Sequence, residues 1–340
     1  MAKLAVIGAG AWGTALACHA ARIGHDVTLW AFEPEVAEEI RSRHVNATYL
    51  PDAELPESLD ASADVAQAVQ GAEVVLLVPP SSHLRAVSEG VAPALEEGAL
   101  VVVASKGVEE GSLKLMSQVL SEALPRVPAE RISYLSGPSF AKEVAAGLPT
   151  DVALASDGMT AARRVQELLH APRFRVYTSG DPIGVQVGGA VKNVMAIATG
   201  ACDGLGFGAN ARAALITRGL AEITRLGVAL GADPLTFLGL AGVGDLVLTC
   251  TGDLSRNRTL GRKVAEGLDP STYLAGQHTV AEGYSTCAAT WELARKCDVD
   301  MPITEHVFHV LHRQRPLLEA VELLVSREFK DELHGIRDPG

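Results

Sequence analysis

One lysine stands alone in a long uncharged stretch with the pattern of a helix. Lys192 is the only formally charged residue between Asp181 and Asp203. Burying an ammonium ion in apolar surroundings is costly and lowers its pKa, which is how a lysine becomes a general acid or base near neutral pH. The alternative is a surface lysine whose stem lies along the helix and whose charge reaches solvent. The pattern makes Lys192 the first candidate for proton transfer.

Two loops that follow expected strands carry further polar groups. Lys106 lies in Ser-Lys-Gly just after the apolar run at 100–104, and a Gly-Pro-Ser-Phe-Ala loop at 137–141 follows the run at 132–135. Ligands of open α/β sheets bind at the carboxyl ends of the parallel strands. We therefore expect both loops at a ligand-binding edge, with ordinary connections as the alternative.

A third cluster lies further along the chain. Asp245 stands in a short apolar turn, where its carboxylate needs a partner, and Lys192 is the natural one. Ser255, Arg256 and Asn257 precede a helical pattern, so a hydroxyl, a guanidinium and an amide could meet at a helix N-terminus. A guanidinium and backbone N–H groups both suit a phosphate. The plainer interpretation is a helix cap beside solvated arginines.

The N-terminal segment has the pattern of a nucleotide-binding turn. Gly8, Gly10 and Gly13 follow the first apolar run and open a helical pattern. The first glycine permits a tight turn, the second lets the backbone approach a pyrophosphate, and the third allows close packing of helix on strand. The helix N-terminus then offers N–H donors to the anion. This context favours dinucleotide binding over a purely structural turn.

The end of the second expected strand bears on the choice between NAD and NADP. An acid there usually binds the ribose 2′-hydroxyl, whereas an arginine accommodates a 2′-phosphate. Glu33 lies twenty residues after Gly13, and Phe32 beside it carries no charge. This favours NAD, while Arg41 and Arg43 in the next helical segment leave NADP open.

The elements that must position these residues begin with alternating strands and helices. Helix-length segments, for example 84–95, 112–123 and 160–170, separate short apolar runs. The expected strands are 4–7, 27–30, 74–78, 100–104, 132–135, 152–155 and 175–178. Such alternation predicts an α/β domain of the Rossmann type with a doubly wound, largely parallel sheet.

The strand pattern stops at Asp181-Pro182, which has the composition of a helix N-terminus. Long helical stretches rich in Ala and Leu follow, interrupted by Gly-rich turns. We therefore expect a dinucleotide-binding domain at 1–180, an all-helical substrate-binding domain at 181–330, and a loosely ordered tail at 331–340.

The composition narrows the class of protein. The net charge of −12 argues against nucleic acid or an anionic membrane surface as a general partner, so a phosphate substrate would need a few local cations. Five scattered cysteines indicate reduced thiols rather than disulfides or a zinc site, with a thiol nucleophile as the alternative. Three glycines interrupt the apolar N-terminal run, so we expect no signal peptide, no membrane span and a cytoplasmic location.

Taken in order, these motifs resemble those of the bacterial NAD(P)-dependent glycerol-3-phosphate dehydrogenases. The resemblance runs from about residue 3 to about residue 325 and includes both expected domains. The matching segments are Gly-Ala-Gly-Ala-Trp-Gly-Thr-Ala-Leu at 8–16, Asn46 with Tyr49-Leu-Pro51, Ser-Lys-Gly at 105–107, Gly-Pro-Ser-Phe-Ala at 137–141, Val-Lys192-Asn193, Gly-Phe-Gly-x-Asn210, Gly-Asp245-Leu, Ser-Arg-Asn at 255–257 and Val280-Ala-Glu282-Gly. Two positions depart: many relatives have a basic residue where Phe32 stands, and Pro80 replaces a small polar residue.

The resemblance implies a role for each matching residue. Lys192 would donate and accept the proton, with Lys106 and Asp245 as further catalytic residues. The substrate would contact Lys106, Gly137, Ser139, Lys192, Asp245, Ser255, Arg256 and Asn257. NAD or NADP would contact Ala11, Trp12, Lys106, Ala141, Arg256, Val280 and Glu282, in addition to the residues expected from their own pattern, which are Gly8, Gly10, Gly13, Phe32 and Glu33.

The expected reaction is reversible hydride transfer between a reduced nicotinamide and dihydroxyacetone phosphate, with no metal. It would supply glycerol 3-phosphate for phospholipid synthesis, and the resemblance also implies a homodimer. Two other interpretations remain. One is a different β-hydroxyacid or sugar-phosphate dehydrogenase with the same layout, and the other is a non-enzymatic module that senses NAD(H).

Overall fold

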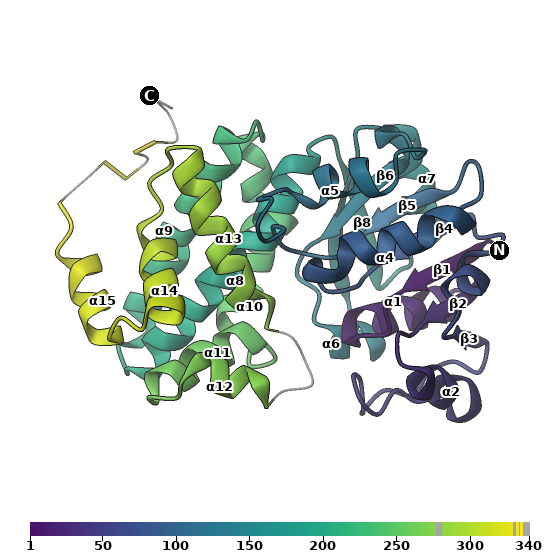
Figure 1. Ribbon diagram of the computed structural model, residues 1–340, viewed down its shortest axis with the longest axis horizontal. Helices are drawn as coiled ribbons and strands as arrows, with labels where there is room; N and C mark the ends of the chain where they lie inside the picture. The colour runs from purple at the N-terminus through teal and green to yellow at the C-terminus, as the bar shows by residue number, and fades with distance from the viewer. Residues whose placement is uncertain (277–280, 329–330, 333, 336–340) are drawn as a thin grey trace. The chain divides into compact units, whose positions relative to one another are not determined.

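The structure is a computed structural model that describes residues 1–276, 281–328, 331–332 and 334–335 (Figure 1). The chain divides into two compact units. The first contains Met1–Ser105 and Met116–Pro182, and the second contains Lys106–Leu115 and the chain from Ile183 onward. Val280 and most of the expected tail at 331–340 lie outside the described residues.

The first unit contains one eight-stranded sheet with the order β3-β2-β1-β4-β5-β6-β7-β8. Its strands are β1 (Lys3–Ile7), β2 (Asp26–Trp30), β3 (Leu59–Ser62), β4 (Val74–Leu77), β5 (Leu100–Val103), β6 (Ile132–Ser136), β7 (Thr150–Ala155) and β8 (Phe174–Ser179). Neighbouring strands are parallel except for β6 and β7, which are antiparallel. The predicted Rossmann-type sheet is confirmed.

One strand of this sheet was not expected from the sequence. β3 is only four residues long, reads Leu-Asp-Ala-Ser, and lies at the edge of the sheet, where it pairs with β2 alone. Strands that are buried on both faces have continuous apolar runs, whereas an edge strand can carry polar residues. β3 therefore lacks the signal that identified the seven other strands.

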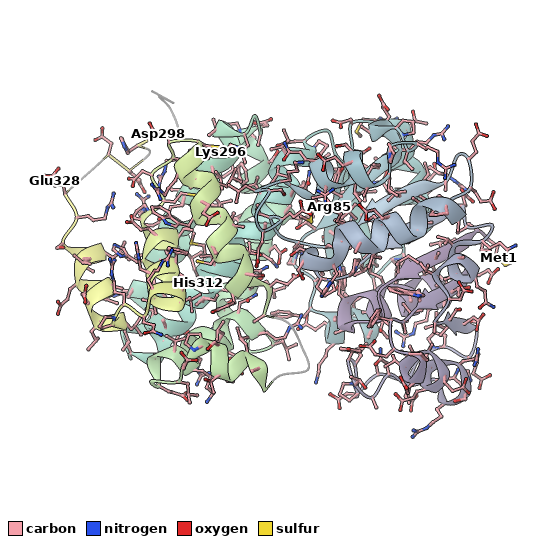
Figure 2. The ribbon with its side chains drawn as sticks, viewed as in Figure 1. Met1, Arg85, Lys296, Asp298, His312 and Glu328 are labelled. Carbon is pink, nitrogen blue, oxygen red and sulfur yellow. The ribbon has the colours of Figure 1, made fainter. Side chains whose placement is uncertain are left out.

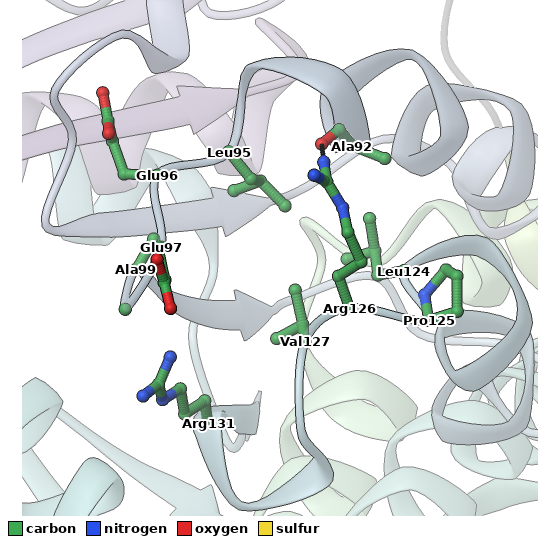
Figure 3. Close-up of a pocket in the computed structure, with 11 residues that line it drawn as sticks. Ala92, Leu95, Glu96, Glu97, Ala99, Leu124, Pro125, Arg126, Val127 and Arg131 are labelled. Carbon is green, nitrogen blue, oxygen red and sulfur yellow. Dashed lines mark hydrogen bonds between the residues drawn. The ribbon is translucent and has the colours of Figure 1, made fainter.

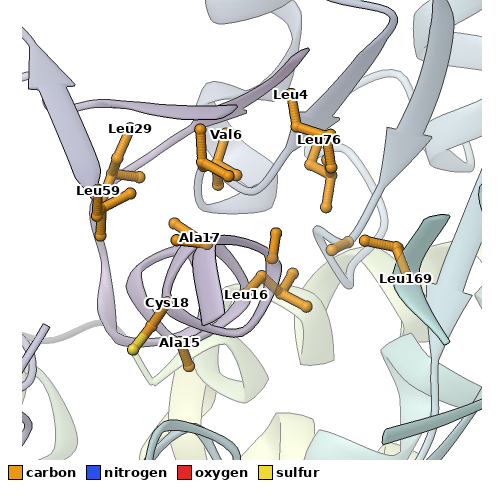
Figure 4. Packing of buried hydrophobic residues seen from close by; sticks show 14 of the residues in the cluster. Leu4, Val6, Ala15, Leu16, Ala17, Cys18, Leu29, Leu59, Leu76 and Leu169 are labelled. Atoms are coloured by element: carbon orange, nitrogen blue, oxygen red, sulfur yellow. The ribbon is translucent and has the colours of Figure 1, made fainter. Parts of the chain in front are cut away.

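Helices pack on the sheet through small and branched apolar side chains. They are α1 (Ala11–Arg22), α2 (Pro34–Arg43), α3 (Val65–Val69), α4 (Leu84–Val91), α5 (Met116–Ala123), α6 (Ala141–Ala145) and α7 (Met159–Leu169), with short turns η1 (Ser81–His83), η2 (Ala92–Ala94) and η3 (Ala129–Arg131). Leu16 and Ala17 of α1 lie in one core cluster with Leu4, Val6 and Leu76 of the strands (Figure 4). Arg85 of α4, which is labelled in Figure 2, forms an ion pair of 2.9 Å with Glu122 of α5.

From Ile183 onward, the second unit is built from helices in the part of the chain that the structure describes. They are α8 (Pro182–Gly204), α9 (Gly208–Ala229), α10 (Asp245–Thr251), α11 (Arg256–Ala265), α12 (Pro270–Ala275), α13 (Glu282–Lys296), α14 (Pro302–Arg313) and α15 (Leu317–Val325), with the turns η4 (Pro234–Leu238) and η5 (Leu240–Gly244). Val191 of α8, Leu226 of α9 and Phe237 of η4 lie in its core. None of the described helices is long and apolar enough to cross a bilayer.

The helix expected at 112–123 begins only at Met116, and the residues before it form a hairpin of the second unit. Val108 and Leu115 pair across this hairpin, and both are buried in the core of the second unit. Gly111 and Leu113 have positive φ, which ends any helical run before Met116. The expected single boundary near residue 180 therefore misses this hairpin. The hairpin places Lys106 in the second unit.

Candidate active site

Two lysines meet one carboxylate inside the second unit. Lys106 Nζ lies 2.7 Å from Asp245 Oδ2, and Lys192 Nζ donates to Asp245 Oδ1. Lys192 Nζ also donates to Thr249 Oγ1 at 3.0 Å. The exposed fraction is only 1% for the side chain of Asp245, 9% for Lys192 and 15% for Lys106. The expected contact between Lys192 and Asp245 is therefore present, and the interpretation of Lys192 as a surface lysine is wrong.

The electrostatics of this cluster favour proton transfer at Lys192. Burial lowers the pKa of Lys192 to about 8, with Lys106 adding to the decrease and Asp245 opposing it. Burial acts to raise the pKa of Asp245, but the charges of Lys106 and Lys192 outweigh it and hold that pKa below its usual value. At neutral pH the cluster consists of an anion between two cations, and one of these cations has a pKa close to the solution pH.

Close approach of two backbones brings Asp245 to Lys192. A Cβ atom at Gly188 of α8 would lie 2.4 Å from the carbonyl oxygen of Ala241, so only glycine allows α8 to pack this closely on η5. The backbone of η5 is kinked at Gly242, whose φ of −97° and ψ of −106° are not helical, and Asp245 begins α10 directly after it. Thr249 lies one turn further along α10, which explains why it reaches the same ammonium group.

Residues 255–257 have three different environments. Ser255 caps α11, because its Oγ accepts a hydrogen bond from the N–H of Arg258 at 3.2 Å. Asn257 is buried: its Nδ2 donates to Asn193 Oδ1 at 2.9 Å, and its Oδ1 accepts from the N–H of Gly283 at 3.0 Å. Arg256 is exposed, and its guanidinium has no hydrogen-bond or ion-pair partner among the described residues. Arg256 is thus the cation of this segment that is available to an anion.

The interpretation of these arginines as solvated side chains fails for Arg258. This side chain is only 11% exposed and binds two carboxylates, Asp203 at 2.8 Å and Asp253 at 2.8 Å. Asp203 also pairs with Arg212 at 2.7 Å. The network joins α8, α9 and α11 and thereby holds the segment that carries Arg256. Arg258 had no expected role, because ion pairs between distant segments leave no local pattern in the sequence.

Glu282, for which a cofactor contact was expected, is the first residue of α13 and is half-buried. Its neighbour Gly283 makes the hydrogen bond to Asn257. The start of α13 is therefore tied to the start of α11. Val280, expected beside it, lies outside the described residues.

The glycine turn of the first unit has the geometry that the sequence predicted. Gly8 has a φ of +121°, a backbone conformation that residues other than glycine rarely adopt. A Cβ at Gly13 would lie 1.9 Å from the carbonyl oxygen of Gly8, so the third glycine is required for α1 to follow the turn this closely. Gly10 directly precedes α1. A Cβ atom at Gly10 would have no other atom within 4 Å, so there is open space beside its backbone.

The start of α1 has unused hydrogen-bond donors. No side chain in the described part of the chain caps this helix, and its first turn contains no acidic residue. The Nε1–H of Trp12 is buried and has no partner among the described residues. Ala11 and Trp12 are half-buried. Free backbone donors at a helix N-terminus fit the pyrophosphate of a dinucleotide.

Asn46 is hydrogen-bonded to the glycine turn. It is fully buried, and its Nδ2 donates to the carbonyl oxygen of Ala9 at 2.8 Å and to Thr14 Oγ1 at 2.9 Å. Its Oδ1 accepts from the N–H of Tyr49 at 3.1 Å. The resemblance implied no role for Asn46 or Tyr49, because a single asparagine gives no sign in the sequence that it is buried.

Glu33 and Phe32 lie where β2 leads into α2. Phe32 is 78% exposed, and Glu33 is half-buried with its Oε1 accepting from the hydroxyl of Tyr49 at 2.8 Å. Arg41 pairs with Glu38, and Arg43 pairs with Glu39 at 3.3 Å. Both arginines are thus already paired with acids of their own helix.

The loop at 137–141 follows β6, which runs parallel to β5. Gly137 has a φ of +133°, and Ser139 Oγ donates to its carbonyl oxygen at 2.9 Å. Ala141 is half-buried and begins α6. The loop therefore lies at the carboxyl edge of the sheet, as the sequence predicted.

The cysteines do not fit a nucleophile. All five are free thiols, and four of them are buried. Cys250 lies on α10, the helix of Asp245, and burial raises its pKa to about 12. Cys250 therefore stays neutral near pH 7, and the thiol-nucleophile interpretation is not supported by its surroundings.

A hollow of about 250 Å³ lies elsewhere in the first unit, near the amino ends of β5 and β6 (Figure 3). Its walls include Glu96, Glu97 and Arg131, and Arg126 there donates to the carbonyl oxygen of Ala92 at 2.7 Å. None of the expected site residues lines it, and ligands of such sheets bind at the opposite edge. Within the described ranges, no group of three or more His, Cys, Asp or Glu side chains is arranged to hold a metal ion.

Both units of the chain match one protein family. Residues 3–162 match the family described as NAD-dependent glycerol-3-phosphate dehydrogenase N-terminus, and residues 181–322 match the corresponding C-terminus. A protein of Geobacter metallireducens named glycerol-3-phosphate dehydrogenase (NAD(P)+) is 52% identical over 97% of this chain and 98% of its own length. One of the same name from Anaeromyxobacter dehalogenans is 49% identical, over 97% of this chain and 100% of its own.

Solved structures agree with these relatives. The crystal structure of glycerol-3-phosphate dehydrogenase from Coxiella burnetii superposes with a TM-score of 0.91 at 41% identity, covering 96% of this chain and 99% of that one. Matches of this extent include both units, the glycine turn and the cluster around Lys192. The chain belongs to the NAD-dependent glycerol-3-phosphate dehydrogenase family.

Proposed function

We propose that this protein is an NAD(P)-dependent oxidoreductase that interconverts dihydroxyacetone phosphate and glycerol 3-phosphate. The observation that carries the proposal is the buried cluster in which Lys192 and Lys106 share Asp245. A sensor that only binds a dinucleotide has no use for a buried lysine whose pKa is about 8. Relatives named for this activity support the substrate and the cofactor class.

Lys192 is the proposed proton donor and acceptor. When bound, the reduced nicotinamide supplies a hydride to the carbonyl carbon of the substrate. The carbonyl oxygen becomes an alkoxide, and Lys192 gives it the proton that completes the hydroxyl group. Lys192 is left neutral and still bound to Asp245 and Thr249, which keep its nitrogen in place. In the reverse direction the neutral amine removes the same proton.

Other residues bind and orient the substrate in this proposal. The exposed guanidinium of Arg256 and the capped start of α11 suit the phosphate group. Asn257 contributes its remaining amide hydrogen, while Lys106, Gly137, Ser139 and Ser255 complete the expected set. Binding energy from the phosphate, which is remote from the reacting carbon, helps to orient the carbonyl group.

Most of the proposed cofactor contacts belong to the first unit. Gly8, Gly10 and Gly13, with the uncapped start of α1 at Ala11 and Trp12, fit a pyrophosphate. Glu33 with uncharged Phe32 supports a preference for NAD over NADP. Ala141, and Lys106, Arg256, Val280 and Glu282 of the second unit, are the remaining proposed contacts. A homodimer, a cytoplasmic location and a supply of glycerol 3-phosphate for phospholipids complete the proposal.

The direct test is the loss of reduced-cofactor absorbance when dihydroxyacetone phosphate is added, with NADH and NADPH assayed separately. We expect turnover with both and a higher kcat/KM with NADH. Turnover with another hydroxyacid or sugar phosphate but not with this substrate would point to a related dehydrogenase. Cofactor binding without turnover of any of these substrates would favour the sensor.

The pH dependence of the reaction follows from the pKa of Lys192. Reduction needs the protonated lysine, so kcat/KM for reduction should be high below pH 8 and fall tenfold per pH unit well above it. Oxidation of glycerol 3-phosphate needs the neutral amine, so its kcat/KM should rise through the same region. Both profiles are measured above pH 7, because the substrate phosphate itself titrates near a pKa of about 6. A reduction profile that rises between pH 7 and 9 would contradict the role of Lys192.

A further inference from the structure

A short turn connects the glycine loop to Glu33. The N–H of Leu50 donates to the carbonyl oxygen of Asn46 at 2.9 Å, which closes the turn. Asn46 reaches the carbonyl of Ala9 within the glycine loop and also accepts from the N–H of Tyr49. The backbone of Tyr49 is therefore held by the same buried side chain that holds the loop. The position of the Tyr49 backbone relative to the glycine loop is therefore fixed.

The side chain of Tyr49 has one strong partner. Its hydroxyl donates to Glu33 Oε1 at 2.8 Å, and the tyrosine is half-buried. Burial and the adjacent carboxylate raise the pKa of Tyr49, so the hydroxyl keeps its proton and remains a donor. The bond occupies one oxygen of the carboxylate and leaves the second oxygen for a ligand hydroxyl.

We propose that Tyr49 is a positioning residue that determines cofactor choice, because its hydroxyl holds the Glu33 carboxylate toward the ribose. In this position the carboxylate accepts a hydrogen bond from the 2′-hydroxyl of NAD and repels the 2′-phosphate of NADP. Without the bond, the flexible glutamate side chain can rotate away from a 2′-phosphate and avoid the repulsion. The inference rests on the proposed function, since it requires a nicotinamide dinucleotide in this site.

The neighbouring charges support this assignment. Arg41 and Arg43 are the cations of the adjoining helix that could attract a 2′-phosphate, and each is paired with an acid of that helix. Phe32 brings no charge. The position of Glu33 is therefore the feature of this segment that distinguishes the two cofactors, and Tyr49 controls that position.

The test measures dissociation constants of NADH and NADPH by titration of cofactor fluorescence, without substrate. In wild type, NADH should bind more tightly than NADPH. Tyr49→Phe should weaken NADH about fivefold, as expected for loss of one hydrogen bond, and should leave NADPH unchanged or tighter. The Kd ratio of NADPH to NADH should therefore fall at least fivefold. In a Glu33→Gln background, Tyr49→Phe should change this ratio less than twofold, because the two residues act through one bond.

Tyr177→Phe, at a tyrosine that is 43% exposed on β8, is the matched control and should change neither constant more than twofold. In Glu33→Asp the side chain is shorter, so its carboxylate no longer reaches the Tyr49 hydroxyl, and the Kd ratio of NADPH to NADH should fall as well. This variant provides a second test if Tyr49→Phe folds poorly. Equal weakening of both cofactors by Tyr49→Phe would show a merely structural role and overturn the inference, as would equal affinity of wild type for both.

These outcomes separate the inference from the proposed reaction. A wild-type chain that shows the expected ratio and its loss in Tyr49→Phe, but does not reduce dihydroxyacetone phosphate, supports the role of Tyr49 and refutes the reaction. A wild-type chain that binds neither cofactor overturns both.

Discussion

Lys192→Ala is expected to lower kcat for reduction of dihydroxyacetone phosphate by about 10³-fold, the usual contribution of a positioned general acid. The variant should fold, because Asp245 keeps its ion pair with Lys106 at 2.7 Å when Lys192 is removed. Its Kd for NADH should stay within about twofold of wild type, since the proposed pyrophosphate site lies on the glycine turn. Single-turnover kinetics and a cofactor titration measure the two effects separately.

Lys263→Ala is the matched control for loss of a lysine. Lys263 lies on α11, its side chain is 37% exposed, and it pairs with Glu266, the residue directly after this helix. This variant should retain wild-type kcat. Added methylammonium should restore part of the activity of Lys192→Ala, because it can occupy the space of the missing amine and supply the proton. A normal kcat in Lys192→Ala would exclude Lys192 as the proton donor.

Asp245→Asn is expected to destabilise the protein by about 3–5 kcal/mol, as does loss of one partner from a buried ion pair. The buried ammonium group of Lys192 and the half-buried one of Lys106 would then lose the counter-charge that they share. The attraction of Asp245 acts to raise the pKa of Lys192, so its loss should lower that pKa further. The pH at which reduction falls should therefore move below pH 8. Chemical denaturation and the pH dependence of kcat/KM measure these effects.

Two further variants test the electrostatic origin of this destabilisation. Asp253→Asn removes a carboxylate that is 91% exposed, and its effect should stay within about 0.5 kcal/mol. The double variant Asp245→Asn with Lys192→Met removes one of the unbalanced charges and should be more stable than Asp245→Asn alone. If the double variant is less stable than the single variant, the loss comes from packing and not from charge.

Local patterns in the sequence were sufficient for several features. The glycine turn follows from the spacing of Gly8, Gly10 and Gly13, since a φ of +121° at Gly8 and the contact of Gly13 with its carbonyl both exclude other residues. The buried strands follow from continuous apolar runs. The importance of Lys192 follows from its isolation in an uncharged helix, because no residue within that segment can balance its charge.

Only the tertiary structure decided which distant residues meet. Lys106 and Asp245 are 139 positions apart, and Lys192 and Asp245 are 53 apart. Their contact depends on the packing of α8 against η5 and on the hairpin at 106–115, which belongs to the second unit although β5 and α5 flank it. This hairpin depends on residues with positive φ and on the contact of Val108 with the core of the second unit. Neither feature produces the regular spacing of apolar residues that identifies a helix or a strand in a sequence.

The same distinction explains why some residues had no expected role. Tyr49 and Arg258 act through hydrogen bonds and ion pairs with other segments, and these interactions require only that two groups lie within about 3 Å. Thr249 alone had a local signal, four residues after Asp245 on one helix face. Periodicity and backbone geometry are properties of a short segment, so the sequence by itself determined the elements and the glycine turn. Burial and pairing depend on how the segments pack, and the tertiary structure alone determined the charged cluster and the link from Asn46 through Tyr49 to Glu33.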